Sequence, residues 1–422
     1  MKQSKETFAG ESFFTLGGKL DVSSTKPLTV AFIGGSLTEG EIDYEGTSLE
    51  NENLKWSNVV IRFLSGLFPL RPLKAINVGL GGTGSEYGAA RFEHDVLSHD
   101  PDLIFIEFSC NDCPTSEADC EGFGKRYRQM YLESMIRQCM RAPKVPAIVY
   151  MHVPVPYGEK QMRLFKKGCA IKQEVLDHYG IGTIDAMADF AREFAARQKE
   201  NPDLTREEFL KQYYEQYENG GFNVHPYASG YLFFALSVIN ALCKEPEKYF
   251  SPFRMREEIY CKEDEKQVNL ACRYLGVTSD RIDYRGEWRL YTAEHPFENN
   301  DPTLRMNPNR LRKACHFPGG IMQIENPCGA SFSFETEADR ICMPHISAKA
   351  GLNAIVYADG QRVGEATCQS IWHGMNYMGS WILLPKGKKR VRFEIQDASA
   401  EPSLFRFGYI IEGFENESGS CL

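Results

Sequence analysis

A serine and a histidine far apart in the sequence could together perform nucleophilic chemistry. Ser36 lies in the glycine-rich segment GGSLTEG, directly after the largely apolar run LTVAFI of residues 28–33. A serine hydroxyl becomes a nucleophile when a base takes its proton, and acyl transfer also needs donors for the developing oxyanion. His225, in FNVHPYASGY, is the best candidate base because it lies in a proline-flanked turn before a predicted helix. The pair predicts a nucleophilic serine with its general base.

Two other chemistries also use glycine-rich turns. A phosphate-binding loop needs a lysine after its last glycine, but Gly40 is followed by Glu41, which would repel phosphate. The segment GLGGTG, Gly79–Gly84, has the glycine spacing of a dinucleotide-binding turn, with Glu107 on the next predicted strand as the candidate ribose ligand. This alternative stays open, although it gives GGSLTEG no role and places Glu107 inside its strand.

The cysteines predict reduced thiols rather than a disulfide framework. Their number, 13, is odd, and they are scattered along a large chain. Cys110, Cys113 and Cys120 form the closest group, but no second C-x-x-C or histidine pair follows to complete four zinc ligands. We therefore predict no metal and no other cofactor.

Length and charge limit the possible partners. With 422 residues the chain exceeds what one core usually supports, so two domains are expected. The net charge is −9 and no stripe of Lys and Arg is present, which argues against a nucleic-acid partner. The N-terminal segment lacks the features of a signal peptide, and no run of about 18 apolar residues occurs. A cytoplasmic protein without membrane contact is expected.

Short apolar runs alternate with helical periodicity between residues 27 and 245, which predicts an α/β domain with a parallel sheet. Such sheets place their ligands at the carboxyl ends of the strands, where Ser36 follows the first strand. The predicted strands are 27–34, 73–79, 102–108, 145–151 and 181–184. The predicted helices are 56–67, 85–98, 119–141, 186–199, 204–217 and 228–243.

The pattern changes after about residue 295 to short β-rich runs separated by turn residues. Asp359 and Gly360 lie between two such runs and predict a tight hairpin turn, because such turns need positive φ. A β-sandwich is expected. The predicted organisation is an N-terminal segment 1–26 that could add an edge strand, a catalytic domain 27–247, a connector 248–294 with one helix, and a β-sandwich domain 295–422.

Four segments carry a family resemblance. GGSLTEG, NVGLGGTGSEYGAAR, FIEFSCND and NVHPYASGY, in this order, resemble the four blocks of the SGNH, or GDSL-like, hydrolases across residues 27–245. The resemblance implies a flavodoxin-like three-layer fold, Ser36 as nucleophile and His225 as general base. It also implies an oxyanion site made by the N–H of Ser36, the N–H of Gly82 and the side-chain amide of Asn111.

One position departs from the family pattern. The family usually has an aspartate three residues before the histidine, where this chain has Phe222. Another acceptor must then orient His225: Glu218, the amide oxygen of Asn223, or a main-chain carbonyl, as in some carbohydrate esterases of the superfamily. The alternative is a non-catalytic carbohydrate-binding protein.

The substrate is inferred by analogy of architecture. No long apolar lid-like segment accompanies the catalytic blocks, and an SGNH-like domain followed by a β-sandwich resembles carbohydrate O-acetyl esterases. We therefore expect hydrolysis of O-acetyl esters on sugars or oligosaccharides, with other small acyl esters or thioesters as alternatives. Trp372, in SIWHGMNYMGSW, could stack on a sugar ring or could belong to the sandwich core.

Overall fold

A computed structural model describes residues 19–40, 53–250, 253, 255–292, 317, 319–325, 329–347, 351–369, 376–396 and 404–415. The chain divides into two compact units, Met1–Val268 and Asn269–Leu422. Each unit has its own hydrophobic core. Residues 1–18 of the segment 1–26, for which an edge strand is predicted, lie outside the described residues, as do Glu41 and Trp372.

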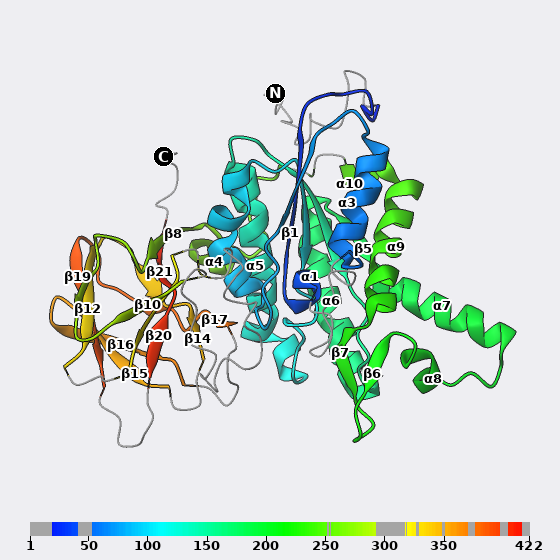
Figure 1. The fold of residues 1–422 in the computed structure, drawn as a ribbon. Helices are drawn as coiled ribbons and strands as arrows, with labels where there is room; N and C mark the ends of the chain where they lie inside the picture. The colour runs from blue at the N-terminus through cyan, green and yellow to red at the C-terminus, as the bar shows by residue number, and fades with distance from the viewer. Residues whose placement is uncertain are drawn as a thin grey trace. The chain divides into compact units, whose positions relative to one another are not determined.

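The first unit is built on the five-stranded parallel sheet that the sequence predicts (Figure 1). Its strand order is β2-β1-β3-β4-β5, the flavodoxin-like order. Strands β1, β3 and β4 are almost entirely buried, as expected for central parallel strands covered on both faces. The strands are β1 (Leu28–Gly34), β2 (Leu73–Asn77), β3 (Leu103–Glu107), β4 (Ala147–His152) and β5 (Gly182–Asp185).

Helices cover both faces of this sheet and complete the three-layer fold. Figure 1 shows α4 and α5 on one side and α3 and α9 on the other; α6 packs on α5, and α3 packs on α9. The longer helices are α3 (Trp56–Leu67), α4 (Ser85–Asp95), α5 (Gly122–Arg141), α6 (Glu159–Tyr179), α7 (Ala186–Glu200) and α9 (Ala228–Lys244). The short ones are α1 (Ser36–Glu39), α8 (Arg206–Leu210), α10 (Pro246–Phe250) and α11 (Glu265–Val268).

Aromatic packing in the core positions the first strand and the turn after it. Phe32 of β1 stacks on Phe105 of β3 with ring centroids 5.1 Å apart, and Trp56 packs edge-on against both rings. The indole Nε1 of Trp56 donates a hydrogen bond of 3.0 Å to the carbonyl of Leu37. The turn that contains Ser36 is therefore held by α3 as well as by β1.

Two elements of the first unit differ from the prediction. The 21-residue helix α6 was not predicted, and the helix predicted for 204–217 ends at Leu210. After Leu210 the chain forms the hairpin of β6 (Tyr214–Gln216) and β7 (Phe222–Pro226), with a turn at Asn219-Gly220. Gly220 has a φ of 81°, and an Asn-Gly pair favours such a turn over continued helix.

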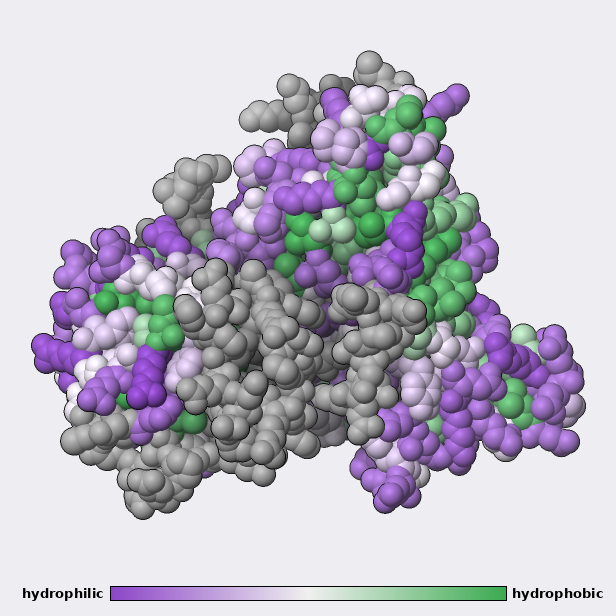
Figure 2. Space-filling view, viewed as in Figure 1, coloured by the Kyte–Doolittle hydropathy of each residue, from purple (hydrophilic) through white to green (hydrophobic). Residues whose placement is uncertain are grey.

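Surface hydropathy differs between the helices of the first unit. Figure 2 shows an apolar strip over the region of α3 and α9, where Leu232 and Leu236 of α9 are 38% and 46% exposed. The helix α9 therefore presents apolar side chains to solvent as well as to the core. Within the described part of the chain, no helix is long and apolar enough to span a membrane.

The second unit is a β-sandwich, as predicted. A five-stranded sheet of order β16-β15-β19-β12-β9 and a four-stranded sheet of order β18-β13-β21-β8 share one core. In this core Phe332 stacks on Phe393 and on Phe407, with centroid distances of 4.5 and 4.4 Å. The five-stranded sheet contains β9 (Asp283–Arg285), β12 (Ser331–Thr336), β15 (Asn353–Ala358), β16 (Gln361–Thr367) and β19 (Lys389–Ile395). The four-stranded sheet contains β8 (Leu270–Gly276), β13 (Arg340–Cys342), β18 (Ile382–Leu383) and β21 (Tyr409–Glu415).

Smaller sheets complete the unit. They are formed by β10 (Arg289–Tyr291), β11 (Ile321–Ile324) and β20 (Phe405–Phe407), and by β14 (His345–Ile346) with β17 (Asn376–Tyr377). Asp359 and Gly360 form the predicted turn between β15 and β16, with φ values of 47° and 83°. Strands β8, β9 and β10 come from the stretch for which the sequence predicts a connector with one helix.

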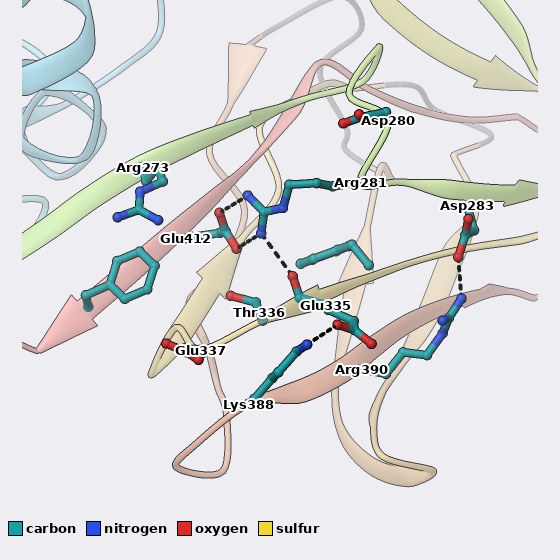
Figure 3. A pocket seen from close by; sticks show the side chains of 12 residues that line it. Arg273, Asp280, Arg281, Asp283, Glu335, Thr336, Glu337, Lys388, Arg390 and Glu412 are labelled. Atoms are coloured by element: carbon teal, nitrogen blue, oxygen red, sulfur yellow. Dashed lines mark hydrogen bonds and ion pairs between the residues drawn. The ribbon is translucent and has the colours of Figure 1, made fainter.

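A charged pocket of about 490 Å³ opens on the second unit (Figure 3). Arg281 forms a two-point ion pair with the buried Glu412, with N–O distances of 2.8 and 3.1 Å. Two further pairs, Lys388 with Glu335 and Arg390 with Asp283, line the same pocket. The charges on the lining are therefore largely matched within the pocket.

Candidate active site

The fold brings Ser36 and His225 into direct contact. Ser36 is the first residue of α1, immediately beyond the carboxyl end of β1, and His225 lies on β7. The Nε2 atom of His225 is 2.8 Å from the Oγ atom of Ser36. Ser36 is largely buried and His225 is half-buried. A histidine at this distance can take the serine proton.

Asn111 lies beside the serine turn. A Cβ atom added to Gly35 would come within 2.7 Å of Oδ1 of Asn111, so the side chain of Asn111 packs directly against the backbone before Ser36. Only glycine leaves room for this approach. Asn111 follows β3, the neighbour of β1, so two adjacent strand ends carry the two groups.

Gly82 lies in the loop between β2 and α4 and has a φ of 76°, in the left-handed region that favours glycine. The preceding residue, Gly81, donates its N–H to Oε2 of Glu39 at 2.7 Å. Glu39 is buried on α1, the helix that starts at Ser36. Its carboxylate therefore fixes the Gly82 loop relative to the serine turn, a role that our sequence analysis did not assign.

A second buried carboxylate connects the serine turn to the end of β3. Glu107 is 1% exposed; its Oε1 accepts hydrogen bonds from the N–H and hydroxyl of Ser109, and its Oε2 accepts one from the hydroxyl of Thr38. Burial raises the pKa of Glu107, and the two Ser109 hydrogen bonds partly oppose that shift. Enclosed in this way, Glu107 has no access to a ribose, and the dinucleotide alternative loses its acidic ligand.

The segment around His225 has no aspartate at the position usual in the family. Phe222 packs against the aromatic cluster of Phe209, Leu210, Tyr213 and Tyr214. Asn223 accepts the main-chain N–H of His225 on its Oδ1 at 3.1 Å and donates from Nδ2 to Oε2 of Glu215 at 3.2 Å.

The structure describes two of the three candidate acceptors. The amide oxygen of Asn223 binds the main chain of His225, and Glu218 is exposed in the hairpin turn. Glu215 and Asn223 position the backbone of His225, and sequence analysis missed Glu215 because its role depends on the unpredicted hairpin.

The cysteine cluster next to Asn111 is engaged in other contacts. Cys110 lies 3.4 Å from the hydroxyl of Tyr157, and the sulfur of Cys113 accepts a hydrogen bond from Gln161 at 3.2 Å. Burial raises the pKa of the Cys110 thiol to about 12, so it stays protonated and is a poor metal ligand. Among the residues that the structure describes, no group of histidine, cysteine and carboxylate side chains could hold a metal ion.

Comparison with known families agrees with this geometry. Residues 32–232 match the sequence model of the GDSL-like lipase/acylhydrolase family. Residues 32–232 of the first unit form a GDSL-like hydrolase domain. This match and the fold make the chain a carboxylic ester hydrolase. No curated protein sequence matches significantly.

Solved structures resemble the whole chain, including the unit that follows the GDSL-like domain. A two-domain esterase active on acetylated mannans, co-crystallized with mannopentaose, is 18% identical, with a TM-score of 0.61 and coverage of 94% of both chains. Another structure of a two-domain esterase active on acetylated mannans has a TM-score of 0.62 at 18% identity, covering 93% of this chain and 92% of the other. The two-unit fold is therefore shared with these esterases.

Proposed function

We propose that the chain is a serine esterase that removes O-acetyl groups from sugars or oligosaccharides. The contact of 2.8 Å between Ser36 Oγ and His225 Nε2 carries this proposal. The substrate class rests on the likeness, over 94% of the chain, to an esterase active on acetylated mannans. Mannan-type oligosaccharides are accordingly the first substrates to test.

The first half of the reaction forms an acetyl-enzyme. Ser36 Oγ attacks the acetyl carbonyl carbon while His225 Nε2 takes the hydroxyl proton. The N–H of Ser36, the N–H of Gly82 and the amide of Asn111 donate hydrogen bonds to the oxyanion, and one such donor is typically worth about 3 kcal/mol. When the tetrahedral intermediate collapses, His225 returns the proton to the departing sugar oxygen.

The second half releases acetate. His225 takes a proton from a water molecule, which attacks the acetyl carbon of the acetyl-enzyme and forms a second tetrahedral intermediate. This intermediate expels Ser36 Oγ, which recovers its proton from His225. One ester bond and one water molecule are consumed, and a free sugar hydroxyl and acetate are formed.

Acetate release tests the proposal directly. We expect wild-type protein to release acetate from acetylated manno-oligosaccharides and from an aryl acetate, and Ser36→Ala to lose at least about 1,000-fold in kcat. Ser65→Ala is the matched control, because Ser65 is exposed on α3 and its hydroxyl bonds only to the carbonyl of Ile61 within that helix. Binding of acetylated sugar without serine-dependent release would instead support a non-catalytic carbohydrate-binding protein.

A further inference from the structure

A lysine is enclosed in the middle of the GDSL-like domain. Lys172, on α6, is 1% exposed. Its Nζ lies 2.9 Å from Oδ2 of Asp112 and donates to the carbonyl of Phe108 at 3.1 Å. Burial disfavours the charged form of Lys172, but the Asp112 carboxylate, together with Tyr150 and Cys169, outweighs it and raises the pKa. Two buried charges are tolerated here because they form a pair.

Asp112 links the loop of Asn111 to the loop of Gly82, which carry two donors of the proposed oxyanion site. It follows Asn111 directly in the sequence. Its Oδ1 accepts the N–H of Ser85, the first residue of α4, at 2.9 Å, and a Cβ on Gly84 would come within 2.6 Å of the same oxygen. One carboxylate thus fixes the loop of Asn111 against the loop that ends two residues after Gly82.

The helix α6 supports the Asn111 loop along one face. Gln161, Gly168 and Lys172 are spaced by seven and four residues, so they lie on one stripe of the helix. Gln161 donates to the sulfur of Cys113, and a Cβ on Gly168 would come within 2.6 Å of Cδ of Pro114. Three successive contacts therefore join α6 to residues 112–114.

We propose that Lys172 is a positioning residue for the oxyanion site, acting through Asp112 on Asn111 and on the Gly82 loop. Lys172 contacts no substrate, and its charge is matched by that of Asp112, so its effect is geometric. Without the ammonium group, Asp112 would remain as a buried unpaired carboxylate, and the loop would shift to hydrate or protonate it. The inference rests on the proposed esterase function.

The experiment compares kcat and KM for an aryl acetate in Lys172→Met, Lys172→Arg and wild type. We expect Lys172→Met to lower kcat about 100-fold, the cost of misplacing a catalytic group by about 1 Å, with KM changed less than about threefold. Lys172→Arg keeps the charge, so its kcat should be at least about tenfold higher than that of Lys172→Met. If Lys172→Met does not fold, Lys172→Met with Asp112→Asn replaces it, because this double variant leaves no unpaired buried charge.

Lys144→Met is the matched control. Lys144 pairs with the buried Asp102 at 2.7 Å, at the opposite end of β3 from Asn111. Lys144→Met should keep kcat within about twofold of the wild-type value, because it breaks an ion pair away from the candidate site. Equal kcat values in folded Lys172→Met and Lys144→Met would overturn the positioning role, even if Lys172→Met unfolds at a lower temperature. Absence of serine-dependent release by the wild type would overturn the esterase proposal, and this inference with it.

Discussion

The substitution Gly35→Ala tests the geometry of the proposed oxyanion site most directly. The added methyl carbon would lie 2.7 Å from Oδ1 of Asn111, whereas an ordinary contact starts at 3.4 Å. The difference, 3.4 − 2.7, is about 0.7 Å, which the Asn111 side chain must yield. The main-chain carbonyl of Thr83 lies 3.3 Å from the same carbon, which is also closer than an ordinary contact.

A displacement of this size should appear in kcat. Misplacing a catalytic group by about 1 Å costs about 100-fold, so we expect Gly35→Ala to lower kcat for an aryl acetate by about 10- to 100-fold. KM should change little, because the oxyanion donors act mainly in the transition state. Steady-state kinetics with an aryl acetate, on protein whose folding is verified by thermal unfolding, measures both constants.

Gly66→Ala is the control for this substitution. Gly66 lies on α3 with nothing within 4 Å of an added Cβ, and alanine favours a helix by about 0.5–1 kcal/mol over glycine. This variant should keep full activity and unfold at the same or a higher temperature. The reasoning would be refuted if Gly35→Ala were as active as Gly66→Ala.

Three further predictions concern other parts of the molecule. Asn223→Ala removes the acceptor for the His225 main-chain N–H and the donor to Glu215. It should lower kcat for an aryl acetate about tenfold, and a wild-type kcat would contradict a role of Asn223 in positioning His225. His152 has a pKa lowered to about 3 by burial and by Lys172, so it stays neutral in the fold while it protonates below pH 6.5 when unfolded. His152 should therefore lower the free energy of unfolding by about 1.4 kcal/mol per pH unit from pH 6.5 towards 3. In urea titrations, the free energy of unfolding of His152→Asn should depend less on pH over this range. Trp372→Ala should raise KM for acetylated oligosaccharides but leave KM for an aryl acetate unaffected. If neither KM changed from the wild-type value, Trp372 would have no role in sugar binding.

Strands buried on both faces could be predicted from the sequence, whereas packing between distant elements could not. The runs that form β1, β3 and β4 are almost wholly apolar, and the turn at Asp359 and Gly360 needs residues that accept positive φ. The helix α6 was missed because Gly168 and Lys172 interrupt its apolar stripe, and both are explained by contacts with residues 112–114.

The candidate site shows the same division. The positions of Ser36 and His225 could be predicted because each lies next to an element with a clear pattern, and the structure brings them together. The oxyanion roles of Gly82 and Asn111 follow from the family resemblance and stay proposals. The partners Glu39, Glu215 and Lys172 could not be predicted, because each acts through a hydrogen bond or ion pair set only by the tertiary fold.

Three of the buried carboxylates in the GDSL-like domain have a consequence for how such an enzyme diversifies. Glu39, Glu107 and Asp112 each join two segments that carry or adjoin the candidate catalytic groups, and all three are at most 5% exposed. Because these three carboxylates are buried, the exposed side chains around the candidate site are free to vary. Selection can then exchange one ester substrate for another by changing surface loops, while the chemistry is inherited intact.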